Sequence, residues 1–388
     1  MANLLNFAIV LRNNMKKIFM IGNVASMMIN FRQELIIKLS KENEVYCLTT
    51  DYDEKSKDKI RSFGAIPLDY SLNAKGLNPF KDILATINLI KTIKKYKPDI
   101  VFSFFVKPVI FGSMAAKFSG VKKIIGMIEG LGNAFTNHKD GLTIKAKIIK
   151  FVQICLYKIS LPLLDTLILL NNDDKKDLID DYNINVKKVE ILGGIGVDLD
   201  KFAYLEAPTQ PISFIFIARL LKEKGIFEYL QAAKIIKEKY SQTKFYIFGT
   251  FDEKNPFALK KEELEIYLKD EIVIYPGFVD NINEQIAKCS VFVLPSYREG
   301  FPRSTQEAMA IGRAVITTDV PGCRDTVQDG INGFLISPHN AEILAEKMEI
   351  FIKNPNLISQ MGEKSRQIAE QKFDINKANE RLGGVLVF

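Results

Sequence analysis

The stretch that decides the fold reads VFVLPSYREGFPRSTQEAMAI and spans residues 291–311. Residues 291–294 form a short apolar run that ends at a Pro-Ser turn, which is typical of a strand buried in a parallel sheet. Residues 305–311 are rich in helix formers, which favours a helix there. A strand, a loop and a helix in this order predict a βαβ unit.

The same alternation runs outward from this stretch through nearly the whole chain and restarts after Gln210. In the first half it predicts strands at 17–22, 44–49, 100–103, 124–128 and 167–170, and helices at 32–40, 83–96 and 110–119. In the second half it predicts strands at 212–218, 245–248, 272–275, 291–294 and 314–317, and helices at 227–239, 305–311 and 341–353. The expected fold class is therefore α/β, with two doubly wound, Rossmann-like domains.

The two halves are separated by residues 193–210, which are rich in glycine and have little apolar periodicity. A length of 388 residues also suits two domains. We predict an N-terminal domain over 1–195, a C-terminal domain over 211–365, and a helical segment over 366–388 that packs back on the N-terminal domain. Residues 1–14 are treated as an extension, because Met15 is a second candidate start.

The composition excludes several classes of protein. The 53 Lys and Arg residues exceed the 46 Asp and Glu residues by only seven, which does not indicate a nucleic-acid partner. The four cysteines are far apart and there are only two histidines, so neither a zinc pattern nor a disulfide framework is expected. No secretory signal or membrane-spanning run is evident. These features predict a reduced, cytoplasmic protein without a metal site.

The loop and helix after residue 294 contain the first candidate chemistry. Glu299 lies in the loop and Glu307 in the helix, while Ser304 and Thr305 would offer free backbone N–H groups to an anion at the helix start. If a diphosphate bound there, Glu307 could accept hydrogen bonds from a ribose diol. The alternative is local, since Ser304 and Glu307 also have the spacing of a capping box.

A second constellation follows the first strand of the second half. Arg219 and Lys224 can converge on one anion from a strand-to-helix turn, one as a planar fork and the other as a point charge. The alternative is a solvated basic loop without a ligand.

Together and in this order, the two stretches resemble the family 4 glycosyltransferases over essentially the whole chain. This family contains retaining enzymes with two facing Rossmann-like domains and a cleft between them, the GT-B arrangement. The other matching motifs are Gly196-Val197-Asp198 with Phe202, Phe248-Gly249, Gly277-Phe278-Val279, Leu294-Pro295-Ser296 and Gly330 with Gly333.

The resemblance implies that the second domain binds a nucleotide-sugar donor. Arg219 and Lys224 would hold the diphosphate, and Glu307 the ribose. Glu299 would be a catalytic residue that holds the sugar together with the backbone after it. The remaining donor-site residues implied are Gly22, Gly249, Gly277, Phe278, Val279, Gly300, Phe301, Pro302, Ser304 and Thr305. A diphosphate with fixed positive partners needs no metal. Asp51-Tyr52-Asp53 looks like the metal-binding D-x-D pattern of other transferases, but it follows a strand of the first domain, so we read it as a solvated loop.

The first domain should bind the acceptor, and here the resemblance is to transferases that extend polyprenyl-diphosphate-linked glycans, N-acetylgalactosaminyltransferases among them. The acceptor residues it implies are Asn23, Ser26, Lys107, Glu129, Gly130 and Gly132. Many relatives have a histidine near the position of Val106. This chain has none there, so a catalytic histidine cannot be carried over to it. Lys107 is assigned a catalytic role instead, with an ordinary surface lysine as the alternative.

The region 136–165 combines five lysines with many apolar residues and only two aspartates. A basic amphipathic helix can lie in a membrane interface, where a lipid-linked acceptor would be found. The alternative is a core-facing helix with a lysine face. The lysines are Lys139, Lys145, Lys147, Lys150 and Lys158.

The expected function is a retaining, metal-independent transfer of a HexNAc or hexose from a UDP-sugar to a lipid-diphosphate-linked glycan. It would serve O-antigen, capsule or protein-glycan assembly on the cytoplasmic face of the bacterial inner membrane. Two alternatives stay open at this point. One is a UDP-sugar 2-epimerase of the same architecture, and the other is an inactive nucleotide-sugar-binding partner.

Overall fold

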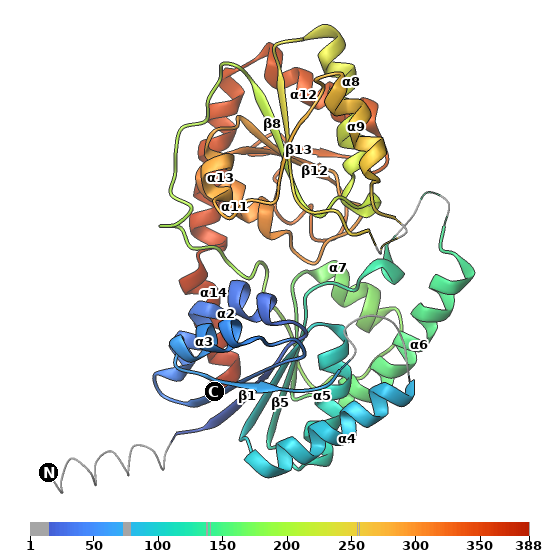
Figure 1. The fold of residues 1–388 in the computed structure, drawn as a ribbon, viewed down its shortest axis with the longest axis vertical. Helices are drawn as coiled ribbons and strands as arrows, with labels where there is room; N and C mark the ends of the chain where they lie inside the picture. Colours follow the sequence, from blue (N-terminus) through green and yellow to red (C-terminus); the bar gives the residue numbers. More distant parts are fainter. Residues whose placement is uncertain are drawn as a thin grey trace, which may run out of the picture. The chain divides into compact units, whose positions relative to one another are not determined.

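The computed structural model describes residues 15–72, 79–136, 139, 141–253, 255 and 257–387, which separate into two compact units (Figure 1). Unit 1 comprises the described residues of Met1–Leu131, Ile144–Leu192 and Asn379–Phe388. Unit 2 comprises those of Gly132–Thr143 and Gly193–Ala378. The predicted extension 1–14 lies outside the described residues.

Unit 1 is built on a parallel sheet of seven strands in the described part of the chain. Its spatial order is β3 (Ile66–Asp69), β2 (Glu44–Thr49), β1 (Lys17–Ile21), β4 (Ile100–Phe104), β5 (Lys123–Ile128), β6 (Thr166–Leu169) and β7 (Val189–Ile191). The chain moves one way along the sheet from β1 to β3 and the other way from β4 to β7. Because such crossovers are right-handed, the reversal places helices on both faces.

The helices of unit 1 follow from that topology. On one face α2 packs against α3, and on the other α5 packs against both α4 and α6 (Figure 1). The bounds are α2 (Ala25–Ser40), α3 (Glu54–Ser62), α4 (Pro79–Tyr96), α5 (Val106–Phe118), α6 (Ile144–Ser160) and α7 (Asn172–Lys175). Short helical turns occupy Asn133–Phe135, Leu161–Leu163 and Lys176–Asp180.

Unit 2 contains a second parallel sheet. Its order is β10 (Ile274–Gly277), β9 (Lys244–Phe248), β8 (Ser213–Ile217), β11 (Val291–Leu294), β12 (Ala314–Thr318) and β13 (Gly333–Ile336). The helices are α8 (Ile226–Lys239), α9 (Lys261–Lys269), α10 (Ile282–Ala287), α11 (Arg303–Ile311), α12 (Ala341–Lys353), α13 (Asn356–Lys372) and α14 (Ile375–Val387), with a 3-10 turn at Lys222–Lys224. The α/β class and the two parallel sheets are confirmed.

Several elements differ from their predicted bounds. Helix α2 begins at Ala25 instead of residue 32, because the Ala25 N–H donates to Asp51 Oδ1 at 2.7 Å across the sheet edge. Helix α3 was not predicted, since Ile60 is its single buried residue. Its N-cap is Asp53, whose side chain accepts from the Ser56 N–H. Asp51 and Asp53 are exposed and each caps a helix, whereas Tyr52 between them is half-buried.

The end of the chain also divides differently from the predicted segment 366–388. Helix α13 packs against α11 and β12, so residues 366–378 stay with unit 2 and only Asn379–Phe388 group with unit 1. Segment Gly132–Thr143 belongs to unit 2 as well, where Arg298 Nη1 donates to the Phe135 carbonyl at 3.1 Å. In the described residues, no helix is long and apolar enough to cross a membrane.

Candidate active site

The strongest concentration of site residues lies at the carboxyl ends of β8 and β11, which are neighbours in the sheet of unit 2. The loop after β8 brings Lys224 Nζ to 2.6 Å from Glu299 Oε1 in the loop after β11. Ser296 Oγ donates to the same carboxylate oxygen at 2.8 Å. Both charged side chains are mostly buried, so the ion pair is screened little by solvent. The structure thus joins two residues that the sequence places 75 positions apart.

The backbone around Glu299 is held by a third loop, the one after β12. The Glu299 N–H donates to the Pro321 carbonyl at 3.0 Å. Gly322 has a φ of +77°, and a Cβ there would lie 2.3 Å from the Glu299 carbonyl oxygen. Only glycine allows such an approach, and the sequence analysis did not identify this residue. Its signal was the Pro-Gly pair at 321–322.

Arg219 lies farther out than Lys224 and has its own partner. Its side chain is 57% exposed, and its Nη1 is 3.8 Å from Asp252 Oδ2. In the described structure Arg219 and Lys224 therefore face different carboxylates. Their convergence on one anion stays a prediction.

Helix α11 excludes one of the two interpretations of Ser304 and Glu307, whereas their role at a ribose or diphosphate stays a prediction. The helix begins at Arg303 after Pro302, so Ser304 lies inside its first turn and the capping-box alternative is wrong. Glu307 Oε1 accepts instead from Arg303 Nε at 3.0 Å. Burial raises the pKa of the Glu307 carboxyl, although Arg303 opposes this shift. Thr305 Oγ1 is buried and has no partner within the described residues.

The other predicted donor residues occupy neighbouring strand ends. The Gly249 N–H after β9 donates to the Gly277 carbonyl at the end of β10 at 3.2 Å, and the Phe278 ring next to it is exposed. Phe301 packs on Phe373 with ring centroids 5.4 Å apart. Of the remaining three, Gly300 and Pro302 in the loop after β11 are buried, and Val279 in the loop after β10 is half-buried.

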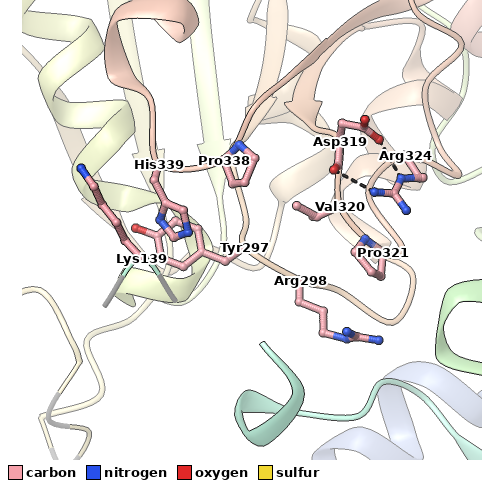
Figure 2. A pocket seen from close by; sticks show the side chains of 9 residues that line it. All are labelled: Lys139, Tyr297, Arg298, Asp319, Val320, Pro321, Arg324, Pro338 and His339. Carbon is pink, nitrogen blue, oxygen red and sulfur yellow. Dashed lines mark hydrogen bonds and ion pairs between the residues drawn. The ribbon is translucent and has the colours of Figure 1, made fainter. Parts of the chain in front are cut away.

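A pocket of about 320 Å³ lies at the carboxyl ends of β11–β13, and its lining includes Arg298 and Pro321 (Figure 2). Arg324 Nε donates to Asp319 Oδ1 at 2.7 Å on one side, and the rings of Tyr297 and His339 lie 3.9 Å apart on the other. Burial and the adjacent Glu228 raise the pKa of the Tyr297 phenol. The sequence analysis predicted none of these residues as ligands.

Around Phe104, the last residue of β4, unit 1 brings together Gly22, a predicted donor residue, and Glu129, a predicted acceptor residue. Gly22 packs against the Phe104 ring, and the Arg32 guanidinium carbon lies 4.9 Å from its centroid. Arg32 is buried and forms an ion pair with Glu129. The Asn23 carbonyl accepts from Thr50, while its Oδ1 is buried with no partner in the described residues.

Lys107 is not a surface lysine, so that alternative is wrong. Its Nζ lies 3.0 Å from both carboxylate oxygens of Asp82 on α4, and the two side chains are only 11% and 3% exposed. Phe105, the residue directly before α5, has a φ of +72°. Of the other acceptor residues, Ser26 is exposed on α2, Gly130 follows Glu129 with a φ of +129°, and Gly132 falls in unit 2. Among the residues described, no three His, Cys, Asp or Glu side chains are grouped to hold a metal ion.

Known protein families match most of unit 1 and most of unit 2. Residues 198–368 match the family described as glycosyl transferases group 1. Residues 17–162 match the family described as glycosyl transferase 4-like. The chain belongs to the glycosyltransferases.

Two relatives of this glycosyltransferase cover most of its length. One is the N,N'-diacetylbacillosaminyl-diphospho-undecaprenol alpha-1,3-N-acetylgalactosaminyltransferase of Campylobacter jejuni, with 27% identity over 94% of this chain and 96% of that protein. The other is the UDP-Gal:alpha-D-GlcNAc-diphosphoundecaprenol alpha-1,3-galactosyltransferase of Escherichia coli, with 26% identity over 86% of this chain and 84% of that protein.

Solved structures share the fold of the glycosyltransferase. The Anabaena protein HepE in complex with UDP and glucose has a TM-score of 0.76 at 15% identity, over 96% of this chain and 99% of that one. TarM has a TM-score of 0.70 at 15% identity, over 97% of this chain and 99% of that one. The GT-B fold expected from the sequence is thereby confirmed.

Proposed function

We propose that this glycosyltransferase moves a HexNAc or hexose from a UDP-sugar to a lipid-diphosphate-linked glycan, for bacterial O-antigen, capsule or protein-glycan assembly on the cytoplasmic face of the inner membrane. The two full-length relatives support the acceptor class, since the names of both specify a diphospho-undecaprenol acceptor. The name of the second also specifies UDP-Gal as donor.

The observation that carries the proposal is the pairing of Lys224 with Glu299 beside the first turn of α11. The ammonium group can bind the diphosphate while the carboxylate accepts hydrogen bonds from sugar hydroxyls. Backbone N–H groups at the start of α11 favour negative charge, and Glu307 lies one turn further along for the ribose.

In the proposed reaction, the acceptor hydroxyl oxygen forms a bond to the anomeric carbon as the bond from that carbon to the diphosphate breaks. UDP leaves with the electron pair, and the hydroxyl proton passes to the leaving phosphate oxygen. Attack on the face that UDP leaves retains the anomeric configuration. Lys224 and the α11 N–H groups stabilise the charge that develops on UDP, so the step is proposed to need no metal.

On the acceptor side, unit 1 supplies a carboxylate and a buried lysine near strand ends. Arg32 fixes the Glu129 carboxylate at the end of β5, and Asp82 fixes the Lys107 ammonium at the start of α5. Both groups suit a glycan whose hydroxyls and phosphates need oriented partners. The region 136–165, which contains α6, is proposed to contact the membrane that holds the acceptor.

The direct test incubates the purified protein with undecaprenyl-diphosphate-linked GlcNAc and a panel of UDP-sugars, with products read by mass spectrometry. We expect one donor to add a single residue in the presence of EDTA, and NMR to show a retained anomeric configuration. Glu307→Ala should weaken UDP binding in calorimetry, whereas Glu346→Ala on the exposed face of α12 should not.

Each other outcome contradicts a named part of the proposal. Conversion of the UDP-sugar without acceptor would indicate a 2-epimerase. Donor binding without turnover on any lipid-diphosphate acceptor would indicate a binding partner. Activity lost in EDTA and restored by a divalent cation would overturn metal independence.

A further inference from the structure

Helix α4 exposes a row of large apolar side chains that the sequence analysis did not identify. Phe80, Ile83, Leu84 and Ile87 are 82%, 55%, 61% and 43% exposed. Their spacing of i, i+3, i+4 and i+7 places them on one stripe of the helix. The buried residues of α4, among them Ala85 and Leu89, belong to the other face. The stripe therefore lies outside the core of unit 1.

Helix α6 exposes a similar row. Ile144, Ile148, Phe151 and Ile159 are between 57% and 79% exposed. Both α4 and α6 pack against α5, which places them in one layer on the same face of the sheet (Figure 1). Two solvent-facing apolar stripes thus flank a single buried helix. Rows of exposed large apolar side chains on two helices of one layer favour an interaction site.

The charges on the two helices are of one sign. The only acidic residue in either sequence is Asp82, which is buried against Lys107. Every exposed charge of this layer is therefore positive, although the whole chain carries a net charge of only +7. The lysines are Lys81, Lys91, Lys94 and Lys95 on α4, and Lys145, Lys147, Lys150 and Lys158 on α6.

We propose that α4 and α6 together form a docking surface for an anionic lipid bilayer. Apolar side chains inserted at headgroup depth and lysines around them are the two contributions that bind a helix to an anionic interface. A second copy of the chain does not suit this surface, because its own eight lysines would face these eight and repel them. Protein interfaces are also depleted of lysine at their centres.

This proposal rests on the proposed function and extends it. The proposed function assigned membrane contact to the region 136–165, and the docking surface adds α4. Asp82 lies on the opposite side of α4 from the exposed stripe and holds Lys107. One helix thus carries both a membrane-facing stripe and the anchor of a predicted acceptor residue. This connection would present the diphosphate of a lipid-linked acceptor to unit 1 from the bilayer surface.

The test is co-sedimentation of the full chain with vesicles of phosphatidylcholine, or of an equimolar mixture with phosphatidylglycerol. We expect binding to the mixed vesicles that weakens at high salt, and little binding to phosphatidylcholine alone. The double variant Phe80→Ser/Leu84→Ser should reduce the partition constant about tenfold. A matched control is Ile266→Ser on α9 of unit 2, which removes an equally exposed side chain and should leave binding unchanged.

Equal binding of the α4 double variant and the wild type would overturn the proposal, as would binding that does not depend on phosphatidylglycerol. If the double variant instead turned a lipid-free dimer into a monomer in analytical ultracentrifugation, the stripe would be a protein interface and the proposal would be wrong. A short-chain, water-soluble acceptor separates this result from the proposed function. The double variant should transfer sugar to the water-soluble acceptor at the wild-type rate. If the wild-type protein transfers sugar neither to this acceptor nor to the membrane-bound one, the result contradicts the proposed function and not the docking surface.

Discussion

The ion pair between Asp82 and Lys107 allows a prediction that separates folding from activity. The ammonium lies 3.0 Å from both carboxylate oxygens, and both side chains are almost completely buried. Asp82→Leu removes the carboxylate that faces the buried Lys107 ammonium, which costs about 3–5 kcal/mol. Lys107→Met leaves the carboxylate unpaired and should cost a similar amount. The double variant removes both charges and should cost less than about 1 kcal/mol, because an apolar pair needs no compensation.

Differential scanning calorimetry measures these losses of stability as shifts in the melting temperature of unit 1. Unit 1 contains roughly 190 residues, for which 1 kcal/mol shifts the midpoint by about 2–4 °C. Each single variant should therefore lower the unit 1 transition by roughly 6–20 °C, and the double variant should restore most of it. Adding UDP should identify the transitions, because UDP is the proposed ligand of unit 2 and should raise the midpoint of that unit.

Two results would refute this reasoning. One is a single variant whose transition moves by less than about 2 °C, which would mean that the pair is hydrated in solution. The other is a double variant that melts as low as either single variant, which would mean that the loss is steric. If the double variant recovers its stability but not sugar transfer, Lys107 acts on the acceptor, as proposed.

Three further predictions test the sites separately. Because burial raises the pKa of Glu307, its ionisation opposes folding as pH rises through that pKa. As pH falls through the same pKa, the carboxylate that we propose for ribose binding becomes protonated. UDP affinity measured by calorimetry should therefore fall on acidification from neutral pH, and a Glu307→Gln variant that keeps the same pH dependence would contradict the assignment. Gly249→Ala places a Cβ 1.9 Å from the Ala218 carbonyl oxygen at a φ of +151°, so unit 2 should melt at a lower temperature and lose UDP binding. The control Gly384→Ala fills open space within α14 and should stabilise by about 0.5–1 kcal/mol; equal melting of the two variants would be the contrary result. Arg32→Ala should raise the KM for the acceptor by leaving Glu129 without its partner, and Arg32→Lys should rescue it only partly because the planar fork is lost, whereas a matching loss of UDP affinity would point to a general structural defect.

The sequence was most informative about elements that depend on local pattern. Residues 291–311 predicted a strand, a loop and a helix, and the structure has β11 and α11 there. What the pattern could not decide was the role of Ser304 and Glu307, because a capping box and a ribose site use the same spacing. Pro302 excludes the capping box by placing the helix start at Arg303, one residue before Ser304, and the ribose site stays a prediction.

Helix α4 shows a different limit. Its apolar residues occur on both faces, so periodicity predicted a helix from 83 without saying which face is buried. Packing against α5 buried Ala85, Leu89 and Ile93 and left Phe80 and Leu84 in solvent. When a helix has two apolar faces, its sequence pattern cannot say which face is buried, because this depends on where the neighbouring helix packs.

By itself the sequence determined the two parallel-sheet domains, because the periods of buried strands and amphipathic helices are local properties of the chain. It also determined the family, since the motifs after the strands occur in a recognisable order. Only the tertiary structure decided which charges meet. Lys224 reaches Glu299 because β8 and β11 are neighbours in the sheet. Arg32 reaches Glu129 because β1, which leads into α2, and β5, which Glu129 follows, lie on either side of β4. Strand order brings together residues from distant segments, and no local pattern encodes that order.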